Sequence, residues 1–348
     1  MENLQDYTSQ LLKQLLEIPS PSGDTKAVMA FVAQALDEIG VGYTVTRKGA
    51  LICTIPGKNT SIQRTLSGHV DTLGAMVKEI KSDGRIKMTQ VGGYAWSTIE
   101  GEYVEIMTRL GERVEGTVLL SKASVHVYGQ EARSLERDEN SLEIRLDRDV
   151  TKAEDVKALG ISVGDYIYFD ARPRIIHDYI KSRHLDDKAG VACMLAIIKQ
   201  VVDKKVELPF TTNFLISNYE EVGHGSCYIP PKTAEFLAID MAAPGKGQCS
   251  QEKEVTICAK DSSGPYSLAL KNKLIEICEN QGINYNIDIY PYYSSDASAA
   301  VKSGWDIVHG LIGPGVDASH AYERTHIEGL MNTIKLGYHY ILDEDLVF

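Results

Sequence analysis

Histidine and carboxylate side chains recur along this 348-residue chain in an order that suits metal binding. Five short motifs carry them: GHVD with His69 and Asp71, LDD with Asp186 and Asp187, YEEVG with Glu220 and Glu221, AID with Asp240, and SHAYERTH with His320 and His326. Each motif lies near the end of an apolar segment. Imidazole nitrogen combined with carboxylate oxygen suits Zn²⁺, Co²⁺ or Mn²⁺. Together the motifs indicate a site for two divalent cations.

Each motif alone also has an ordinary structural interpretation. The H-x-D spacing places two side chains on one face of extended backbone, where a hydrogen-bonded surface pair is as common as a metal site. The aspartate pair begins a long apolar helix and could cap its free amide groups. Asp240 could begin a turn, the glutamates could lie in a solvated loop, and Asp296 could cap the helix that follows it. If these residues did not form a shared site, nearly all of these separate interpretations would have to be true at once. One shared site is therefore favoured.

The adjacent glutamates need a specific explanation, because neighbouring carboxylates repel each other and resist losing water. If Glu220 and Glu221 continue the preceding strand as extended backbone, their side chains point to different sides. One can then bind a metal while the other meets a bound water. A carboxylate shared between two ions about 3.5–4 Å apart would complete such a site. The clustered cations would offset the repulsion between the carboxylates.

The elements that must position these motifs alternate between helix and strand at both ends of the chain. Helical periodicity before residue 40 predicts two helices, the second capped by Asp24 and ended by Gly40. Strands at 43–46, 50–55 and 64–71 follow. From Asp187 helices and strands alternate again, up to a C-terminal helix from about Ile327. This order predicts an α/β domain with a mixed sheet and helices on both faces.

Residues 74–170 show a different pattern, made of short alternating segments and turns. The SDGR turn is a hairpin signal, and ASVHVYG (residues 123–129) is one of the expected strands. This pattern predicts an all-β domain of small-barrel size, inserted into a catalytic domain of residues 1–73 plus 171–348. We expect the insertion to mediate subunit contacts and not to be needed to build the metal site.

Composition excludes several classes of function. The formal net charge of −12, without a basic cluster, argues against nucleic-acid binding and against an anionic membrane surface. The N-terminal segment lacks the pattern of a secretory signal, and no apolar run is long enough to span a bilayer. The six cysteines are scattered without a C-x-x-C pair, which favours reduced thiols and a cytoplasmic location.

The motif order over the whole chain, with a β insertion after H-x-D, resembles the M42 family of dinuclear metalloaminopeptidases, including its glutamyl, deblocking and tetrahedral types. The resemblance implies a zinc-peptidase-like α/β domain, two divalent ions (Zn, Co or Mn) per subunit, and dimers that assemble into tetrahedral dodecamers. It implies that Asp71 orients His69, that Asp186 bridges the ions, and that Glu220 is the general base. It also implies four terminal metal ligands: His69, Glu221, Asp240 and His320. It places one further carboxylate, Asp296, near the substrate.

Two departures from the family pattern are present. Thr72 and Leu73 follow H-x-D where the family often has Glu, and HAYERTH replaces a pattern of the type HS-P-x-E. The second departure leaves His326 open as an alternative to His320. The resemblance implies removal of the N-terminal residue of a peptide. The alternatives are a related dinuclear deacylase or carboxypeptidase and, in other classes, a glycoside hydrolase or a binding protein without catalysis.

Overall fold

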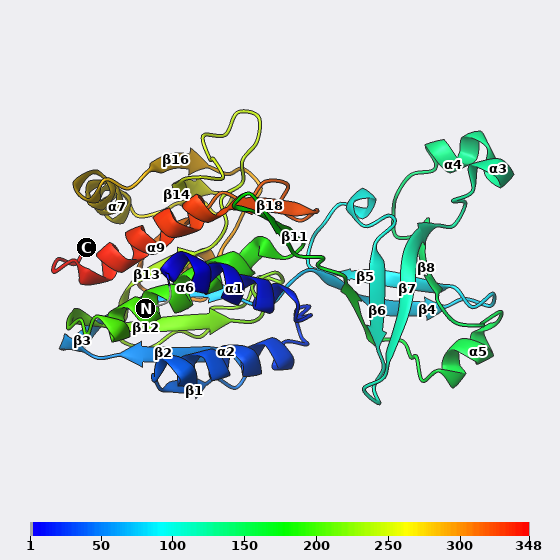
Figure 1. The fold of residues 1–348 in the computed structure, drawn as a ribbon, viewed down its shortest axis with the longest axis horizontal. Helices are drawn as coiled ribbons and strands as arrows, with labels where there is room; N and C mark the ends of the chain where they lie inside the picture. The colour runs from blue at the N-terminus through cyan, green and yellow to red at the C-terminus, as the bar shows by residue number, and fades with distance from the viewer. Residues whose placement is uncertain (1–2, 348) are drawn as a thin grey trace.

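The computed structural model describes residues 3–347 as two lobes joined side by side (Figure 1). The large lobe contains residues 3–73 and 171–347, and the barrel lobe contains residues 74–170. Two short connections join them, one from β3 (Gly57–His69) to β4 (Gly74–Ile80) and one from β9 (Tyr166–Phe169) to β10 (Arg174–Ile176). The H-x-D motif therefore lies where the chain leaves the large lobe.

A nine-stranded mixed sheet forms the centre of the large lobe. Its order is β1-β2-β12-β3-β13-β17-β14-β15, and β16 pairs with β14. The strands not yet given are β1 (Tyr43–Val45), β2 (Leu51–Ile55), β12 (Leu208–Ser217), β13 (Thr233–Ile239), β14 (Val255–Asp261), β15 (Gly264–Pro265), β16 (Tyr285–Ile289) and β17 (Val308–Pro314). The four central strands β12, β3, β13 and β17 run parallel. Their ends toward the candidate site are buried: the last six residues of β3 and the last seven of β12 are all buried.

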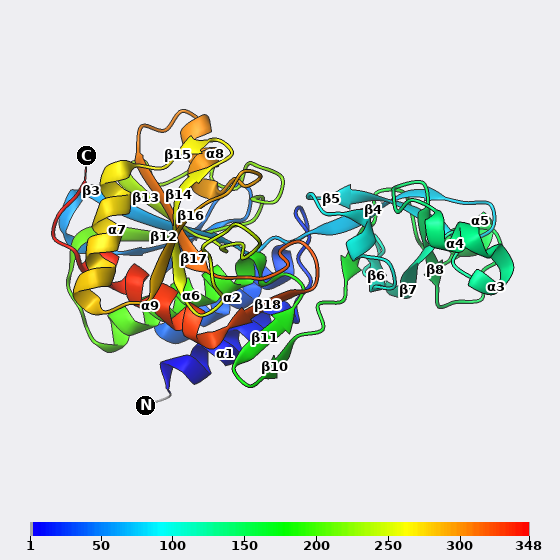
Figure 2. The same ribbon diagram turned by 90° about the horizontal axis from the view of Figure 1, so that it is seen from above.

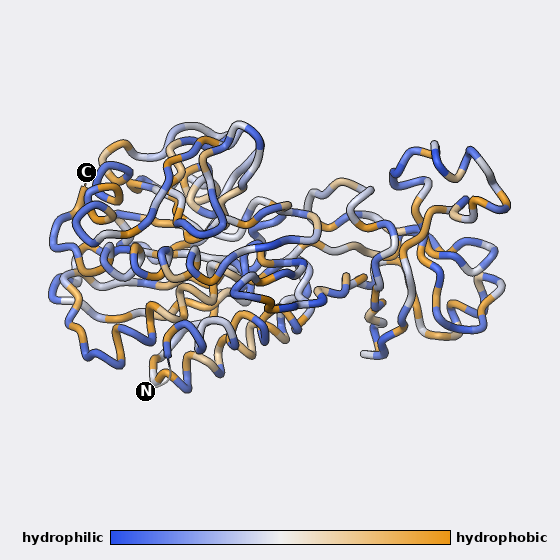
Figure 3. Tube along the Cα trace, turned by 45° about the horizontal axis from the view of Figure 1, so that its top comes forward, coloured by the Kyte–Doolittle hydropathy of each residue, from blue (hydrophilic) through white to orange (hydrophobic). Residues whose placement is uncertain are grey.

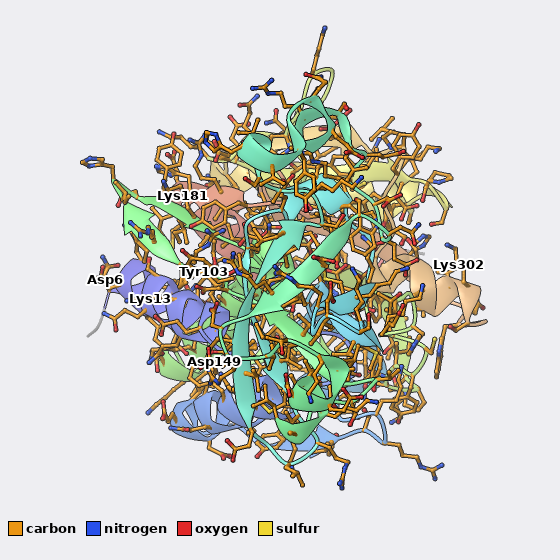
Figure 4. All side chains as sticks on the ribbon, turned by 90° about the vertical axis from the view of Figure 1, so that its right-hand side faces the viewer. Asp6, Lys13, Tyr103, Asp149, Lys181 and Lys302 are labelled. Carbon is orange, nitrogen blue, oxygen red and sulfur yellow. The ribbon has the colours of Figure 1, made fainter. Side chains whose placement is uncertain are left out.

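Helices cover both faces of this sheet. They are α1 (Leu4–Leu16), α2 (Lys26–Ile39), α6 (Leu185–Asp203), α7 (Leu268–Gln281), α8 (Asp296–Lys302) and α9 (Ile327–Leu342). The main apolar core packs α1, α2, α6, α7 and α9 on one face, and a second core packs α8 on the other. Figure 2 shows α8 and α6 on opposite sides of the strands, and Figure 4 shows Asp6 and Lys13 of α1 on the side opposite Lys302 of α8. In Figure 3 orange, hydrophobic and blue, hydrophilic residues alternate along the helices of the large lobe, as expected for helices that cover a sheet with one face.

The barrel lobe is a closed six-stranded barrel, in the order β4-β5-β8-β7-β6-β9. Its further elements are β5 (Ile86–Val91), η1 (Trp96–Thr98), β6 (Tyr103–Met107), β7 (Arg113–Leu120), α3 (Val125–Tyr128), α4 (Gln130–Ser134), β8 (Leu142–Leu146) and α5 (Ala153–Ala158). Its interior is a separate apolar core that includes Ile86, Ile106 and Ile144. The predicted fold class, an α/β domain interrupted by a small β-barrel, is confirmed.

Several local expectations were wrong. The segment around ASVHVYG forms α3 rather than a strand, because its alternating Val125 and Val127 are exposed and the six other strands already close the barrel. Asp24 does not cap α2: Thr25 holds the N-cap position, and Asp24 instead accepts a hydrogen bond from the Tyr168 hydroxyl. Gly40 does end α2, in the left-handed conformation that favours glycine.

A small second sheet was not expected from the sequence. It consists of β10, β11 (Tyr179–Ser182) and β18 (Glu323–His326), with β11 in the middle. Ser182 pairs with Glu323 across the antiparallel β11–β18 ladder. This sheet joins the segment that follows the barrel to the segment that carries His320.

Candidate metal centre

Three parallel strands bring the first set of predicted residues together. His69 is the last residue of β3 and pairs with Ser217, the last residue of β12. Asp240 directly follows β13, on the other side of β3. Because the carboxyl ends of parallel strands meet at one edge of a sheet, the loops that follow them form a common site there.

Asp186 lies between the two predicted histidine ligands. Its Oδ1 is 3.2 Å from Nε2 of His69, and its Oδ2 is 3.3 Å from Nε2 of His320. Asp186 and Asp187 have non-helical backbone angles at the start of α6, and the peptide bond between them is cis. Each oxygen of the Asp186 carboxylate therefore faces a different imidazole, which is the geometry that a bridging ligand needs.

Each of the remaining carboxylates lies near one of the two histidines. Near His69 Nε2 lie Oε2 of Glu220 at 3.6 Å and Oδ2 of Asp240 at 4.0 Å. Near His320 Nε2 lies Oε2 of Glu221 at 3.6 Å. The structure thus brings together every predicted ligand in two groups that share Asp186.

The two glutamates diverge for a different reason than expected. They lie in a turn rather than in extended backbone, and the amide of Gly223 donates to the carbonyl of Glu220 at 2.7 Å. The carboxylate of Asp71 accepts hydrogen bonds from the backbone amides of Glu220 at 3.1 Å and Glu221 at 3.3 Å. It also accepts one from the Ser22 hydroxyl. Asp71 therefore fixes the turn from which both glutamate side chains leave.

Each histidine uses Nδ1 for a backbone carbonyl, which leaves Nε2 facing the carboxylates. Nδ1 of His69 lies 2.9 Å from the carbonyl oxygen of Asp71, closer than the carboxylate of the same residue at 3.5 Å. Nδ1 of His320 lies 2.5 Å from the carbonyl oxygen of Gly93. Because a carbonyl only accepts, both Nδ1 atoms must donate. The Nε2 atoms are then oriented as metal ligands usually are.

The contact with Gly93 links the barrel lobe to the candidate site. Gly93 belongs to the segment between β5 and β6, so the barrel lobe orients a candidate ligand of the large lobe. The Tyr94 hydroxyl, from the same segment, donates to the carbonyl of Gly74 at 3.0 Å. The insertion thus supplies a contact to the candidate site, and the expectation that the site forms without it stays a prediction.

Burial and mutual repulsion make Glu220, Glu221 and Asp240 difficult to ionise. Despite its burial, the pKa of Asp186 is instead held well below its usual range by the two facing imidazoles. Burial, together with neighbouring carboxylates, raises the pKa of Glu220 and of Glu221 well above the usual range, and it raises the pKa of Asp240 to about 7. Burial lowers the pKa of His320, but Asp186 and Glu221 outweigh it and bring the value to about 10. The raised pKa values all reflect excess negative charge in a buried environment, and bound cations would neutralise that charge.

Two buried atoms give a direct test of whether a cation fits. Nε2 of His69 and Oε1 of Glu221 have no hydrogen-bond partner within residues 3–347. Buried polar atoms are normally satisfied, and each such atom needs an explanation. Ligand atoms of His69, Asp186 and Glu221 lie mutually close, and so do those of His69, Asp187 and Asp240. Such sets of imidazole nitrogen and carboxylate oxygen fit divalent cations.

Asp187, which was interpreted only as a helix cap, has a second role. Its Oδ1 accepts from the Gly190 amide at 3.1 Å, and its Oδ2 accepts from the His69 amide at 3.2 Å. A Cβ at Gly190 would lie 2.3 Å from this carboxylate, so glycine in LDDKAG makes room for it. Asp187 also has an oxygen close to His69 and Asp240.

His326 and Asp296 do not reach the cavity wall. Nδ1 of His326 accepts from the Glu328 amide at 3.1 Å and caps α9, so the geometry favours His320 as the ligand. Asp296 follows Ser295, the N-cap residue of α8, and accepts from the Ser217 hydroxyl. It lies behind the turn of the two glutamates rather than among the residues that line the cavity.

The candidate site opens into a cavity of about 560 Å³. Asp186, Glu220, Glu221, Asp240 and His320 lie on one part of its wall. The rest is mainly neutral and includes Met241, Ala243, Pro244, Gln248, Tyr290, Pro291, Tyr292 and Tyr293. The candidate ligands on this wall can therefore be reached from solvent.

Comparisons with known proteins identify the family and the fold of this chain. The sequence model of the family described as M42 glutamyl aminopeptidase matches residues 49–336. The chain is 52% identical over 336 residues to a Bacillus subtilis (strain 168) protein named "Putative aminopeptidase YhfE", which covers 96% of this chain and 97% of that protein. Among solved structures, a TET aminopeptidase from the archaeon Thaumarchaeota archaeon SCGC AB-539-E09 has a TM-score of 0.88 at 20% identity, over 97% of this chain and 98% of that one. The Pyrococcus horikoshii TET1 peptidase has a TM-score of 0.82 at 23% identity, over 97% and 99%. The two structures show a shared fold, and the family match over most of the chain shows that this protein belongs to the M42 glutamyl aminopeptidase family.

Proposed function

We propose that this M42 aminopeptidase hydrolyses the N-terminal residue of peptides with two divalent cations and with Glu220 as the general base. The observation that carries the proposal is the position of Asp186, with one oxygen toward His69 and the other toward His320. One cation would be held by His69, Asp186 and Asp240, and the other by His320, Asp186 and Glu221. Glu220 remains for proton transfer.

The bound cations would polarise the scissile carbonyl and lower the pKa of the attacking water. Glu220 can accept the proton of that water and pass it to the leaving amine. Its side chain is 12% exposed, lines the cavity and lies 3.6 Å from His69 Nε2. Asp71 holds the backbone of this glutamate in place.

The acidic wall favours an aminopeptidase over a deacylase or a carboxypeptidase. A free N-terminus is a cation, and carboxylates beside the reacting carbonyl can receive it. An acylated N-terminus has no such charge. A glycoside hydrolase would need two carboxyl groups facing each other across a sugar. That mechanism gives no reason for Asp186 to lie between His69 and His320.

We also infer a preference for neutral N-terminal residues. Within the part of the chain that the structure describes, no lysine or arginine lines the cavity. The Tyr293 hydroxyl already donates to the Met241 carbonyl at 2.9 Å, and the Gln248 amide donates to the Ile289 carbonyl at 2.8 Å. An acidic side chain would lose water here without gaining a cationic partner, which is costly.

A panel of peptides tests this activity. We expect cleavage of Leu-Gly-Gly-amide, negligible cleavage of its N-acetylated form, and kcat/KM for Glu-Gly-Gly-amide lower by at least about tenfold. The C-terminal amide excludes a carboxypeptidase. Faster cleavage of the acetylated peptide would identify a deacylase instead. If the glutamyl peptide were the best substrate, only the preference for neutral residues would be wrong.

We propose that the chain forms homo-oligomers with a dimer as the building block, up to a tetrahedral dodecamer. The support is the structural likeness to TET1, which assembles into a tetrahedron or an octahedral shell. The barrel lobe also exposes the apolar side chains of Leu110 and Val163, 71% and 68% accessible. It projects from the large lobe, which makes these surfaces available to another subunit (Figure 1).

Light scattering of the full chain should give a mass several times that of one subunit. The double variant Leu110→Asp with Val163→Asp should give smaller particles, because charges replace exposed apolar contacts. Val45→Asp is the matched control, since Val45 is 63% exposed but lies on β1 of the large lobe. A monomeric parent chain, or an unchanged mass of the double variant, would contradict assembly through the barrel.

We propose a cytoplasmic location, which the six free cysteines support because reduced thiols persist there. Among residues 3–347, no helix has both the length and the apolar character required to cross a membrane.

A further inference from the structure

Glu323 makes an unusual set of hydrogen bonds beside the candidate metal centre. Its Oε2 accepts from the backbone amides of Leu185 at 2.6 Å and Asp186 at 3.2 Å. Its Oε1 accepts from the backbone amide of His320 at 3.0 Å. Glu323 is 2% exposed. One carboxylate therefore joins the two segments that carry the shared candidate ligand and the second histidine.

These amides need an acceptor from outside their own segments. The first amides of a helix have no partner within it, and the non-helical backbone at Asp186 and Asp187 extends that gap at the start of α6. His320 has a left-handed backbone, with φ of 64°, in a loop after β17. The Ser319 hydroxyl also joins the two segments, by donating to Asp186 Oδ2 at 3.2 Å, but Glu323 is the acceptor that holds the backbone amides of both.

Glu323 is itself held by regular structure. It is the first residue of β18 and pairs with Ser182 of β11. Its neighbour Arg324 forms two hydrogen bonds with Glu252 at 2.7 and 2.8 Å. A group on a paired strand places its partners more precisely than a group on a free loop. The small sheet thereby fixes Glu323, and Glu323 in turn holds His320 Nε2 and Asp186 Oδ2 at their separation of 3.3 Å.

We propose that Glu323 is a positioning residue that sets the affinity of the cation position formed by His320, Asp186 and Glu221. This inference rests on the proposed metal-dependent function. Glu323 does not bind the cation. It acts through the backbone of Asp186 and His320, and its two oxygens have to accept from both segments at once. A glutamine offers only one acceptor oxygen. Its NH₂ group, which can only donate, would face a backbone N–H group that also donates.

The test is metal affinity of the metal-free full chain, measured by Zn²⁺ titration against a competing chelator. Glu323→Gln should weaken binding of one of two ions by about 10–100-fold, the usual effect of losing a partner that orients ligands. Asp288→Asn is the matched control. Asp288 is 7% exposed and accepts from the amides of Cys249 and Ser250, both at 2.9 Å, away from the candidate ligands. It should keep both Zn²⁺ affinities.

A second variant keeps the proposal testable if Glu323→Gln does not fold. Glu323→Asp retains the charge but is one methylene shorter, so it cannot serve both segments and should also weaken one ion. Thermal melting of the metal-free proteins separates folding from binding. Parental Zn²⁺ affinity in either folded variant would overturn the proposal, and so would failure of both variants to fold, because Glu323 would then be needed for the fold itself. A parent chain that binds no Zn²⁺ would instead refute the proposed metal site.

Discussion

Replacing Glu220 by glutamine is expected to lower kcat by at least about 10²–10⁴-fold, the usual contribution of a general acid–base group, while both cations stay bound. Glutamine has nearly the same volume, and the hydrogen bond from the backbone amide to Asp71 does not depend on the side chain. An amide, however, cannot accept the proton of the attacking water. Because Glu220 acts on the water rather than on the substrate amine, KM should change little.

The neighbouring Glu221 provides the matched comparison for this experiment. Its side chain is 4% exposed, and its Oε1 has no partner among the described residues, as expected for a ligand. Glu221→Ala should therefore lower metal content, whereas Glu220→Gln should not. Metal analysis and kcat for both variants decide between the two roles. If Glu220→Gln lost metal and Glu221→Ala kept both ions, the assignment would be reversed. Near-normal rates in both would mean that the pair is only a polar turn.

Removing the shared ligand should abolish activity through loss of metal. Asp186→Asn keeps the shape of the side chain but loses the charge that faces both histidines. We expect both cations to bind weakly and kcat/KM to fall to background, because one substitution affects both groups. Asp203→Asn is the matched control: Asp203 lies at the other end of α6, in an ion pair with Lys199 at 3.0 Å. It should keep full metal content and activity.

Chelation of the parent protein gives the same result without a substitution. Prolonged treatment should remove activity, and Zn²⁺, Co²⁺ or Mn²⁺ should restore it, since carboxylates and imidazoles suit all three. Metal content is measured alongside kcat/KM at each step. Full activity in metal-free protein, or parental activity in Asp186→Asn, would refute the proposed use of the cations.

The sequence by itself determined the architecture and the identity of the candidate ligands. Alternating helices and strands at both ends, interrupted by short hairpins, indicated an α/β domain with an inserted barrel, because hydrophobic periodicity is a local property of the chain. The side-chain types marked these residues as candidates, since only a few types bind such cations, and the resemblance to the M42 family implied the role of each. His69, Asp186, Glu220 and Glu221 each stood in a short motif near the end of an apolar segment.

Only the tertiary structure decided how these residues are held. The strand order inserts β12 between β2 and β3, so that the glutamate turn lies beside His69 across about 150 residues of chain, and hydrophobic patterns do not encode such crossovers. The choice between His320 and His326 depended on the turn between β17 and β18. The roles of Gly93 and Glu323 could not be predicted, because they act on backbone groups and ring nitrogens whose partners are set by packing. Every residue except proline carries the same amide, so the sequence gives no sign of which amide a buried carboxylate will meet.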